Sequence, residues 1–258
     1  MPTETANRWA LITGAGRGIG RSIALTFAEA GYNLAICARS AASLDDVTSQ
    51  IKALGRDCLA VGADVSSPED VAAFRAALGE KTEALHVIIN NAGAYLDYGL
   101  VAESDPDDWW RTIEINVRGP YLIVRHFLDL MPEGGKIISL TSGKGYQAGQ
   151  NSASYHISKA GLNMFSNALA NELWQRKIDV NLLIPGPTAT TTFTREDPST
   201  GVTADAILER LGDTVPNGLP PWERVKHPDE VAALALQMAS FPEGGPTGQL
   251  FSLARRPV

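Results

Sequence analysis

Hydrophobic and polar positions along this chain follow two patterns that alternate. Short runs rich in β-branched and apolar residues have the length of buried strands, and the longer stretches between them space their apolar residues as one helix face does. The order predicts an α/β fold with a doubly wound, seven-stranded parallel sheet that carries helices on both faces. The predicted strands are 9–13, 33–38, 57–62, 85–90, 136–141, 178–184 and 249–253. The predicted helices are 18–30, 43–54, 68–78, 106–130, 153–176 and 228–240, with Ser67-Pro68 and His227-Pro228 as helix starts.

Residues 185–228 break this alternation. The segment holds many threonines and prolines and one modest helical stretch at 203–211, and it is too long for an ordinary connection. It leaves the carboxyl end of a predicted strand, where doubly wound sheets bind their ligands. We therefore predict one domain over residues 1–258 in which 185–228 is a substrate-binding loop, or lid. A surface excursion without a role is the alternative.

A glycine-rich turn joins the first predicted strand to the first helix. Backbone N–H groups and the positive end of a helix can hold a pyrophosphate at such a turn. The spacing is G-x-x-x-G-x-G and not the common G-x-G-x-x-G. By itself the turn is weak evidence, because glycines also let a strand meet a helix closely. The cofactor-binding residues predicted here are Gly14, Gly16, Arg17, Gly18, Ile19 and Gly20.

The end of the second predicted strand indicates which dinucleotide fits. A carboxylate there binds a ribose 2′-hydroxyl, whereas an arginine accommodates a 2′-phosphate. This chain has Arg39-Ser40, and the first carboxylates, Asp45 and Asp46, fall inside the next predicted helix. Arg39 alone fits a solvated arginine equally well, but the missing acid favours NADP(H), with Arg39 and Arg17 on the 2′-phosphate and Ser40 assisting.

Tyr155 and Lys159 are four residues apart in a predicted helix, so both side chains project from one face. A free phenol titrates near ~10, and we expect the neighbouring ammonium and a cationic nicotinamide ring to favour the phenolate of Tyr155. Tyr155 then exchanges a proton with a substrate oxygen while a hydride moves at carbon. A Tyr/Lys pair alone is weak evidence, since many solvated helix faces carry one.

Two more polar residues stand where they would help. Ser142 ends the fifth predicted strand, and its hydroxyl can bind a carbonyl oxygen as charge develops, although a serine in a tight turn also fits. Asn116 lies inside a long predicted helix, where asparagine is unfavourable unless its amide has a task. Ordering groups beside Lys159 is one such task, and a kink in the helix is another.

Together these motifs resemble the short-chain dehydrogenase/reductase family. The resemblance covers about the first 190 residues, and it rests on the order and rough spacing of several segments rather than on any one. They are Thr13–Gly20, Asn90-Asn91-Ala92-Gly93, Asn116, Ser142, Tyr155-His156-Ile157-Ser158-Lys159 and Pro185-Gly186.

The resemblance implies a single-domain Rossmann fold and an NADP(H)-preferring carbonyl or 3-oxoacyl reductase. It implies a catalytic tetrad of Asn116, Ser142, Tyr155 and Lys159, with Tyr155 and Lys159 also at the nicotinamide ribose. Asp64 and Val65 would lie at the adenine. The segment along the cofactor would be Asn91, Ala92 and Gly93, and the residues flanking the nicotinamide amide would be Pro185, Gly186, Thr188 and Thr190.

The end of the chain departs from the family, because 247–258 lacks the Gly-Gly pair with which many relatives close. Since the family often builds a tetramer interface there, the departure weakens a tetramer more than it weakens the catalytic assignment. We still expect a homo-oligomer, either a dimer or a tetramer.

Rival functions find less support in the sequence. No serine has a G-x-S-x-G elbow, and the four histidines lack metal-ligand spacing, so neither a hydrolase nor a metal site is expected. Epimerases and dehydratases with the same tyrosine and lysine usually have longer chains. A redox-sensing module that binds NADP(H) without turnover is the non-enzymatic alternative, and the intact tetrad argues against it.

Composition and charge narrow the partners. The formal net charge of −7 gives a nucleic-acid backbone no general attraction. The two cysteines, Cys37 and Cys58, are expected to be buried thiols in a reducing compartment. Neither 1–9 nor 254–258 carries a targeting signal, and no stretch approaches the ~18 apolar residues of a membrane span. We expect a cytoplasmic protein that binds no membrane.

The substrate is expected to be a small, mostly hydrophobic carbonyl or alcohol compound, because apolar and aromatic side chains dominate the predicted pocket. Lys144 is the exception; it fits either a contact with an acidic group or, more simply, a solvated lysine. The pocket residues predicted are Tyr95, Leu96, Gly143, Lys144, Tyr146, Gln150, Pro187, Phe193 and Trp222.

Overall fold

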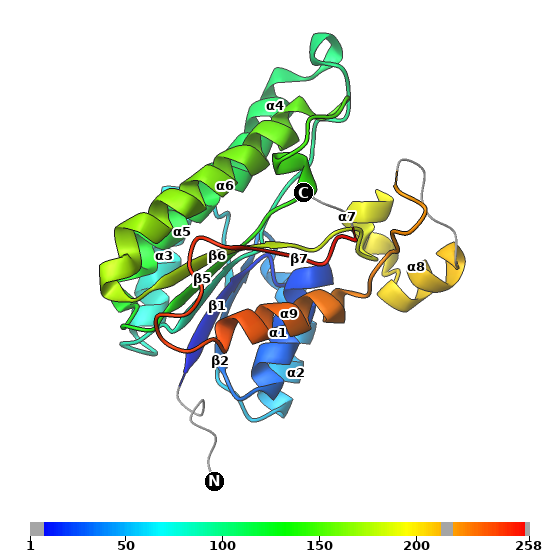
Figure 1. Ribbon diagram of the computed structural model, residues 1–258. Helices are drawn as coiled ribbons and strands as arrows, with labels where there is room; N and C mark the ends of the chain where they lie inside the picture. Colours follow the sequence, from blue (N-terminus) through cyan, green and yellow to red (C-terminus); the bar gives the residue numbers. More distant parts are fainter. Residues whose placement is uncertain (1–7, 213–218, 256–258) are drawn as a thin grey trace.

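Helices cover both faces of one parallel sheet in the computed structural model, which describes residues 8–212 and 219–255 (Figure 1). The strand order is β3-β2-β1-β4-β5-β6-β7, and every neighbouring pair is parallel. The predicted doubly wound sheet is thereby confirmed. The strands are β1 (Trp9–Thr13), β2 (Asn33–Ala38), β3 (Cys58–Gly62), β4 (Val87–Asn90), β5 (Lys136–Leu140), β6 (Asp179–Ile184) and β7 (Leu250–Ser252).

Each face of the sheet has its own apolar cluster, because successive strand residues point to opposite faces. Leu11 packs in one cluster, and its neighbours Ala10 and Ile12 pack in the other. One face is covered by α1 (Gly18–Glu29), α2 (Asp45–Ala53) and α9 (Pro228–Ala239). The other is covered by α3 (Pro68–Gly79), α5 (Gly119–Phe127) and α6 (Ala153–Leu173), with α4 (Pro106–Ile113) packed against α6 (Figure 1).

Helix starts follow the sequence signals. The Ser67 side chain caps α3 by accepting a hydrogen bond from the Asp70 N–H, and His227 forms a capping box with Glu230 at the start of α9. Two predicted helices have a 3₁₀ turn at one end. Ala41–Leu44 precedes α2 and overlaps the start of the helix predicted at 43–54, and Trp174–Arg176 forms the last turn of the helix predicted at 153–176.

The prediction of one helix over 106–130 is wrong. The segment divides into α4, a π-helical turn at Glu114–Arg118, α5, and a 3₁₀ turn at Leu128–Leu130. Pro120 has no N–H to donate to the carbonyl four residues earlier, so the α-helical ladder is interrupted at Asn116. The sequence analysis had offered a kink as one interpretation of this asparagine.

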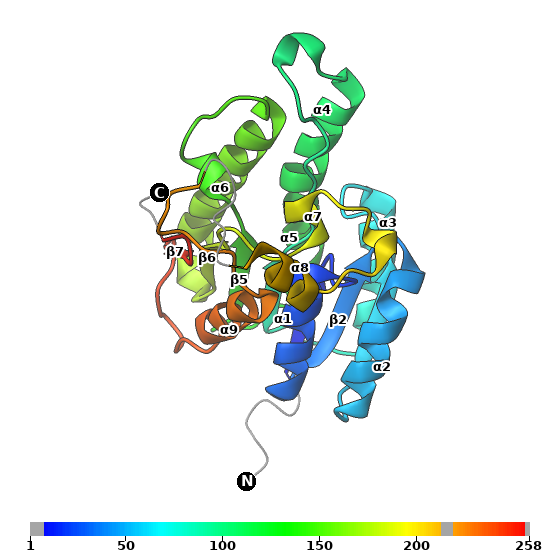
Figure 2. The same cartoon turned by 90° about the vertical axis from the view of Figure 1, so that its right-hand side faces the viewer.

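The segment predicted as a lid holds more helix than expected. The helix predicted at 203–211 is α8 (Ala204–Leu211), but α7 (Thr191–Thr194) and a 3₁₀ turn at Pro198–Thr200 were not predicted. The Thr190 hydroxyl caps the short α7. Both helices stand together beyond the end of β6 (Figures 1 and 2). Residues 213–218 of the predicted lid lie outside the described residues.

The two thiols differ in burial. Cys37 is fully buried, as expected, whereas Cys58 is only partly buried because β3 is an edge strand. Within the described residues no helix has both the length and the apolar character needed to cross a membrane. Residues 1–7 and 256–258, which bear on the expectation about targeting signals, lie outside the described part of the chain.

We predict that Gly20→Ala destabilises the protein by about 1–3 kcal/mol, the usual cost of overpacking. Gly20 lies in the first turn of α1, where a Cβ would stand 2.2 Å from the Gly14 carbonyl oxygen and 2.4 Å from Asn91 Nδ2. Thermal unfolding measures the effect. Gly99→Ala is the matched control, since a Cβ there meets nothing within 4 Å. Equal melting temperatures for the two variants would contradict the packing described here.

Candidate active site

The strand order reverses between β1 and β4, and the turns that follow these strands are bound to each other. The Asn91 amide donates to the carbonyl oxygens of Thr13 (2.8 Å) and Gly14 (3.1 Å). The Thr13 hydroxyl accepts the backbone N–H groups of Asn91 and Ala92. Asn91 was predicted to lie along a cofactor. Its side chain instead forms hydrogen bonds that hold the glycine-rich turn in place.

The amino terminus of α1 is open. Its N-cap is Arg17, whose side chain makes no capping hydrogen bond, and its first turn holds no acidic residue, whereas side chains cap α3, α4 and α9. The free N–H groups and the positive helix end suit a phosphate. Gly18, with φ of +53°, lies against the Thr190 side chain, and Gly16 lies against Ser43. Ile19 packs on the apolar cluster under α1.

Arg17 and Arg39 lie near each other beside this turn, and both keep much of their surface exposed. Partial burial of the Arg17 guanidinium and the nearby Arg39 charge lower the pKa of Arg17, while Asp197 of the predicted lid opposes them. Ser40, also exposed, stands at the N-cap of the short turn before α2, and its side chain makes no capping hydrogen bond. Asp46 pairs with Arg21, so it is bound on the surface of α1 and α2. Two close guanidinium groups suit a doubly charged phosphate.

The residues predicted at the adenine, Asp64 and Val65, follow β3. Asp64 is bound within the protein: its carboxylate accepts hydrogen bonds from Ser66 and forms an ion pair with Arg111 of α4. Burial works to raise the pKa of this carboxyl, but the Ser66 and Arg111 contacts hold it below its usual value. Val65 is buried against Gly119.

Tyr155 and Lys159 share one face of α6, as predicted. Lys159 Nζ lies 5.6 Å from the centre of the Tyr155 ring and donates to the Leu140 carbonyl oxygen at 2.9 Å, which ties α6 to the end of β5. The Gly93 α-carbon lies beside Lys159 and Asn116: a Cβ there would lie 3.7 Å from Lys159 Nζ and 3.2 Å from Asn116 Oδ1. Because glycine has no side chain, the space next to Lys159 Nζ and Asn116 Oδ1 is left free at this position.

The π-helical turn directs the buried Asn116 amide toward the same place. Its Oδ1 accepts the Ala94 N–H at 2.8 Å, and its Nδ2 donates to the Ala94 carbonyl at 2.8 Å and to the Ser158 hydroxyl at 2.9 Å. Asn116 therefore orders backbone groups next to Lys159, as one of the two sequence interpretations had it.

Ser142 lies at the end of β5 and caps the 3₁₀ turn Gly143–Gly145 by accepting the Lys144 N–H at 3.2 Å. Its hydroxyl also forms a hydrogen bond with Tyr155, which acts to lower the pKa of the phenol. The interpretation of Ser142 as a turn residue is therefore confirmed, and its contact with a substrate carbonyl oxygen stays a prediction.

The pKa of Tyr155 is not lowered in the protein alone. Burial raises it to about 12; Tyr95 and Tyr98 add to the increase, and the Ser142 hydrogen bond only partly offsets it. Burial also lowers the pKa of Lys159 to about 8. In the protein alone, burial is the largest effect on the Tyr155 pKa, and the phenolate expected beside a bound nicotinamide stays a prediction. At neutral pH the Tyr155 phenol is protonated and Lys159 is mostly charged.

An aromatic stack not foreseen as a unit extends from Tyr155. The Tyr95 ring stacks on the Tyr155 ring with centres 4.6 Å apart, and Tyr98 lies 3.9 Å from Tyr95. Arg195 of the lid stands over Tyr98 at 4.2 Å. Tyr98 and Arg195 were missed; the one available signal was the spacing of Tyr98 three residues after Tyr95.

Lys144 is not the solvated lysine that the sequence analysis favoured. Its ammonium is partly buried and donates to the hydroxyls of Tyr95 (3.2 Å) and Ser152 (3.1 Å). It therefore supports the face of the aromatic stack next to Tyr155.

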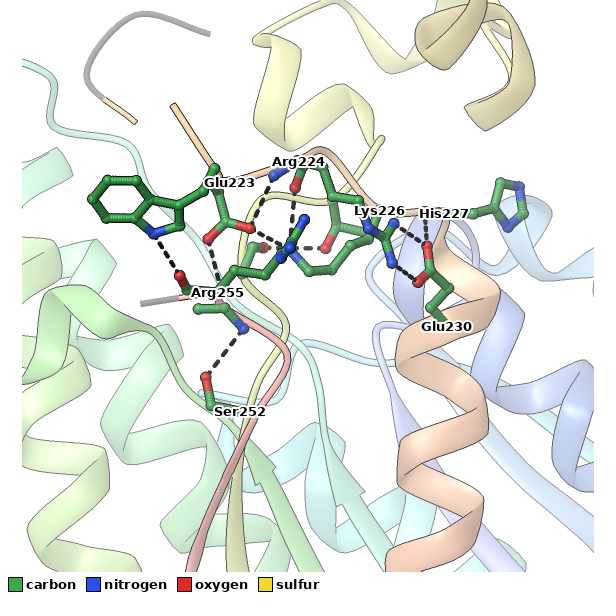
Figure 3. Close-up of polar contacts among 11 residues, drawn as sticks. Glu223, Arg224, Lys226, His227, Glu230, Ser252 and Arg255 are labelled. Atoms are coloured by element: carbon green, nitrogen blue, oxygen red, sulfur yellow. Dashed lines mark hydrogen bonds and ion pairs between the residues drawn. The ribbon is translucent and has the colours of Figure 1, made fainter. Parts of the chain in front are cut away.

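The segment after β6 reaches the same end of the sheet. Gly186 has φ of +69°, and the Thr188 hydroxyl donates to its carbonyl at 3.1 Å. Pro187 and Thr188 are buried, Pro185 is partly buried, and Thr190 faces the glycine-rich turn. Thr188 forms a parallel bridge with Lys226, whose ammonium contacts Glu223 (Figure 3).

Comparisons with known proteins agree with this geometry. A family model described as short chain dehydrogenase matches residues 8–200. A rhamnolipid-biosynthesis 3-oxoacyl-[acyl-carrier-protein] reductase of Pseudomonas aeruginosa is 34% identical, over 96% of this chain and 95% of its own. A Burkholderia cenocepacia short-chain dehydrogenase solved with NADP is 29% identical, with a TM-score of 0.81 over 96% of this chain and 97% of its own. The angucycline C-6 ketoreductase LanV with bound NADP is 28% identical, with a TM-score of 0.80 over 96% and 95%.

Proposed function

Because this chain belongs to the short-chain dehydrogenase family, we propose that it interconverts a ketone or 3-oxoacyl compound and a secondary alcohol with NADP(H), using Tyr155 as general acid and base. The observation that carries the proposal is the arrangement on α6: a protonated phenol and a buried ammonium lie one helical turn apart, and the α-carbon of Gly93 lies beside the ammonium. Oxidoreductase chemistry of this kind needs a proton donor at the carbonyl oxygen.

The residues present fit NADP(H). The open amino terminus of α1 suits the pyrophosphate, and Arg17 with Arg39 suits the 2′-phosphate. Two similar solved structures carry NADP. Tyr155 and Lys159 would hold the nicotinamide ribose, and 185–190 would flank the nicotinamide amide. When bound, the cofactor supplies or accepts the hydride.

Each tetrad side chain has a separate task in carbonyl reduction. Tyr155 donates its proton to the substrate oxygen, and Ser142, already bonded to that phenol, stabilises the charge that develops on the oxygen. Lys159 keeps a positive charge one turn away, which favours the phenolate that remains. Asn116 holds Ala94 and Ser158 so that the turn after β4 and α6 keep their spacing.

The substrate we propose is a hydrophobic ketone or a 3-oxoacyl compound. Tyr95 and Tyr98 form an aromatic surface next to the Tyr155 ring, and such surfaces favour apolar or planar ligands. The Pseudomonas relative is a 3-oxoacyl reductase and LanV is a ketoreductase. The segment 185–228 would close over this substrate as a lid.

We also propose a cytoplasmic homo-oligomer. Free Cys37 and Cys58 suit a reducing compartment. Large apolar side chains on α4, α5 and α6 are exposed, among them Trp110 (61%), Tyr121 (49%) and Met164 (69%). Exposed apolar surface of this kind is typical of a contact between copies.

Tyr155→Phe should weaken NADPH binding by no more than about tenfold, the worth of the one ribose hydrogen bond it removes. It should lower the turnover number for ketone reduction by ~10² or more, because it removes the proton donor and keeps the ring. Fluorescence titration measures the affinity, and NADPH oxidation with a panel of ketones and aldehydes measures turnover. Tyr32→Phe, packed against Phe27, is the control and should behave as wild type. Near-normal turnover by Tyr155→Phe would place the donor elsewhere.

The pH profile of ketone reduction should follow Lys159. The raised pKa of Tyr155, about 12, keeps the phenol protonated throughout the accessible range, while Lys159 loses its proton above about 8. We expect kcat/KM to be flat below pH ~7 and to fall through pH ~8. Lys159→Arg should move the falling limb upward, because guanidinium stays charged. A rate that rises through pH 8 would contradict these assignments.

Arg39→Asp should lower the preference for NADPH over NADH by about tenfold to a hundredfold, the worth of one charge-assisted hydrogen bond. Ratios of kcat/KM for the two cofactors measure it. Arg8→Asp introduces the same charge change before β1 and should leave the ratio as in wild type. An unaltered ratio in Arg39→Asp would show that the 2′-phosphate binds elsewhere.

A further inference from the structure

A fully buried ion pair lies at the base of the lid, outside the tetrad. Lys226 and Glu223 are 1% and 2% exposed, and Nζ lies 2.7 Å from Oε1. Removing two charges from water is costly, and a well-packed apolar pair is often at least as stable. Such a pair therefore calls for a reason beyond stability.

The pair joins the lid to the segment after β7. Lys226 Nζ also donates to the Arg224 carbonyl at 3.1 Å, and the second Glu223 oxygen accepts the Arg255 N–H at 3.0 Å. The Trp222 indole donates to the Arg255 carbonyl at 2.8 Å (Figure 3). The end of the predicted lid around Glu223 is thus bound to Arg255, through Trp222 and through Glu223 itself.

The same lysine holds the segment that follows β6. Its backbone N–H donates to the Pro187 carbonyl at 2.9 Å, and its carbonyl accepts the Ala189 N–H at 2.8 Å. Its ammonium fills the space beside Gly186, where a Cβ would lie 3.1 Å from Nζ. Lys226 therefore contacts 186–189 with both its side chain and its backbone.

We propose that Lys226 and Glu223 are positioning residues that hold 186–189 against the nicotinamide end of the cofactor. The inference rests on the proposed function, in which 185–190 flanks the nicotinamide amide. Without the ammonium, the Glu223 carboxylate is left buried and unpaired, so the segments it joins move apart to admit water. The adenine end of the site, at Arg17 and Arg39, belongs to other elements and should not respond.

The test compares two ligands, NADPH and adenosine 2′,5′-bisphosphate, which has the adenine end and no nicotinamide. Lys226→Met should weaken NADPH binding about tenfold and lower kcat by about tenfold to a hundredfold, as small misplacements do. Its affinity for the bisphosphate should stay within about twofold of wild type. Calorimetric titration of both ligands measures the two affinities, and steady-state NADPH oxidation measures kcat.

Lys136→Met is the matched control. It breaks a second buried pair, with Asp179, at the opposite ends of β5 and β6, so it removes comparable stability far from the carboxyl edge. It should leave the ratio of the two affinities unchanged. If Lys226→Met also leaves the ratio unchanged, the pair serves stability alone and the inference fails.

The double variant Glu223→Gln/Lys226→Met covers the case in which Lys226→Met does not fold. It has no unpaired carboxylate, so its melting temperature should recover toward wild type while the selective loss of NADPH affinity remains. Wild-type affinity of the double variant for both ligands would overturn the inference. Wild-type protein that binds the bisphosphate but neither binds nor oxidises NADPH would overturn the proposed function, and this inference with it.

Discussion

The buried ammonium of Lys159 is the interaction on which the site depends. A charge removed from water needs polar partners, and the Leu140 carbonyl at the end of β5 supplies one at 2.9 Å. That bond fixes α6 against the sheet, so Tyr155 comes to lie next to Ser142 at the end of the same strand. Burial that lowers the pKa of Lys159 also raises that of Tyr155. One enclosed location thus keeps the phenol protonated at neutral pH and holds a cation beside it.

The reversal of strand order between β1 and β4 sets where this chemistry occurs. Asn91 and Thr13 bind the two turns to each other, and the open start of α1 lies on one side while Gly93 and Lys159 lie on the other. In the proposed function, a dinucleotide with its phosphates at α1 would direct its reactive end toward α6. The Glu223–Lys226 pair would complete the arrangement from the lid side, by fixing 186–189.

Much of this could be predicted from the sequence, because periodicity and turn residues are local signals. Spacing and turn residues alone predicted three features: the seven strands, the helix starts at Ser67 and His227, and the common face of Tyr155 and Lys159. The break at Asn116 was only one of two interpretations, because the missing N–H at Pro120 is visible in the sequence but the contact with Ala94 is not. The direction of the Tyr155 pKa was also missed, because burial is a property of the packed fold. Tertiary pairs such as Glu223–Lys226 leave no periodic trace.

A crystal structure of the protein with NADP⁺ tests the central claim most directly. The account predicts that the nicotinamide ribose hydroxyls lie within hydrogen-bonding distance, about 2.7–3.2 Å, of the Tyr155 hydroxyl and of Lys159 Nζ, with the pyrophosphate at the start of α1. A dinucleotide bound with its nicotinamide ribose away from α6 would contradict it.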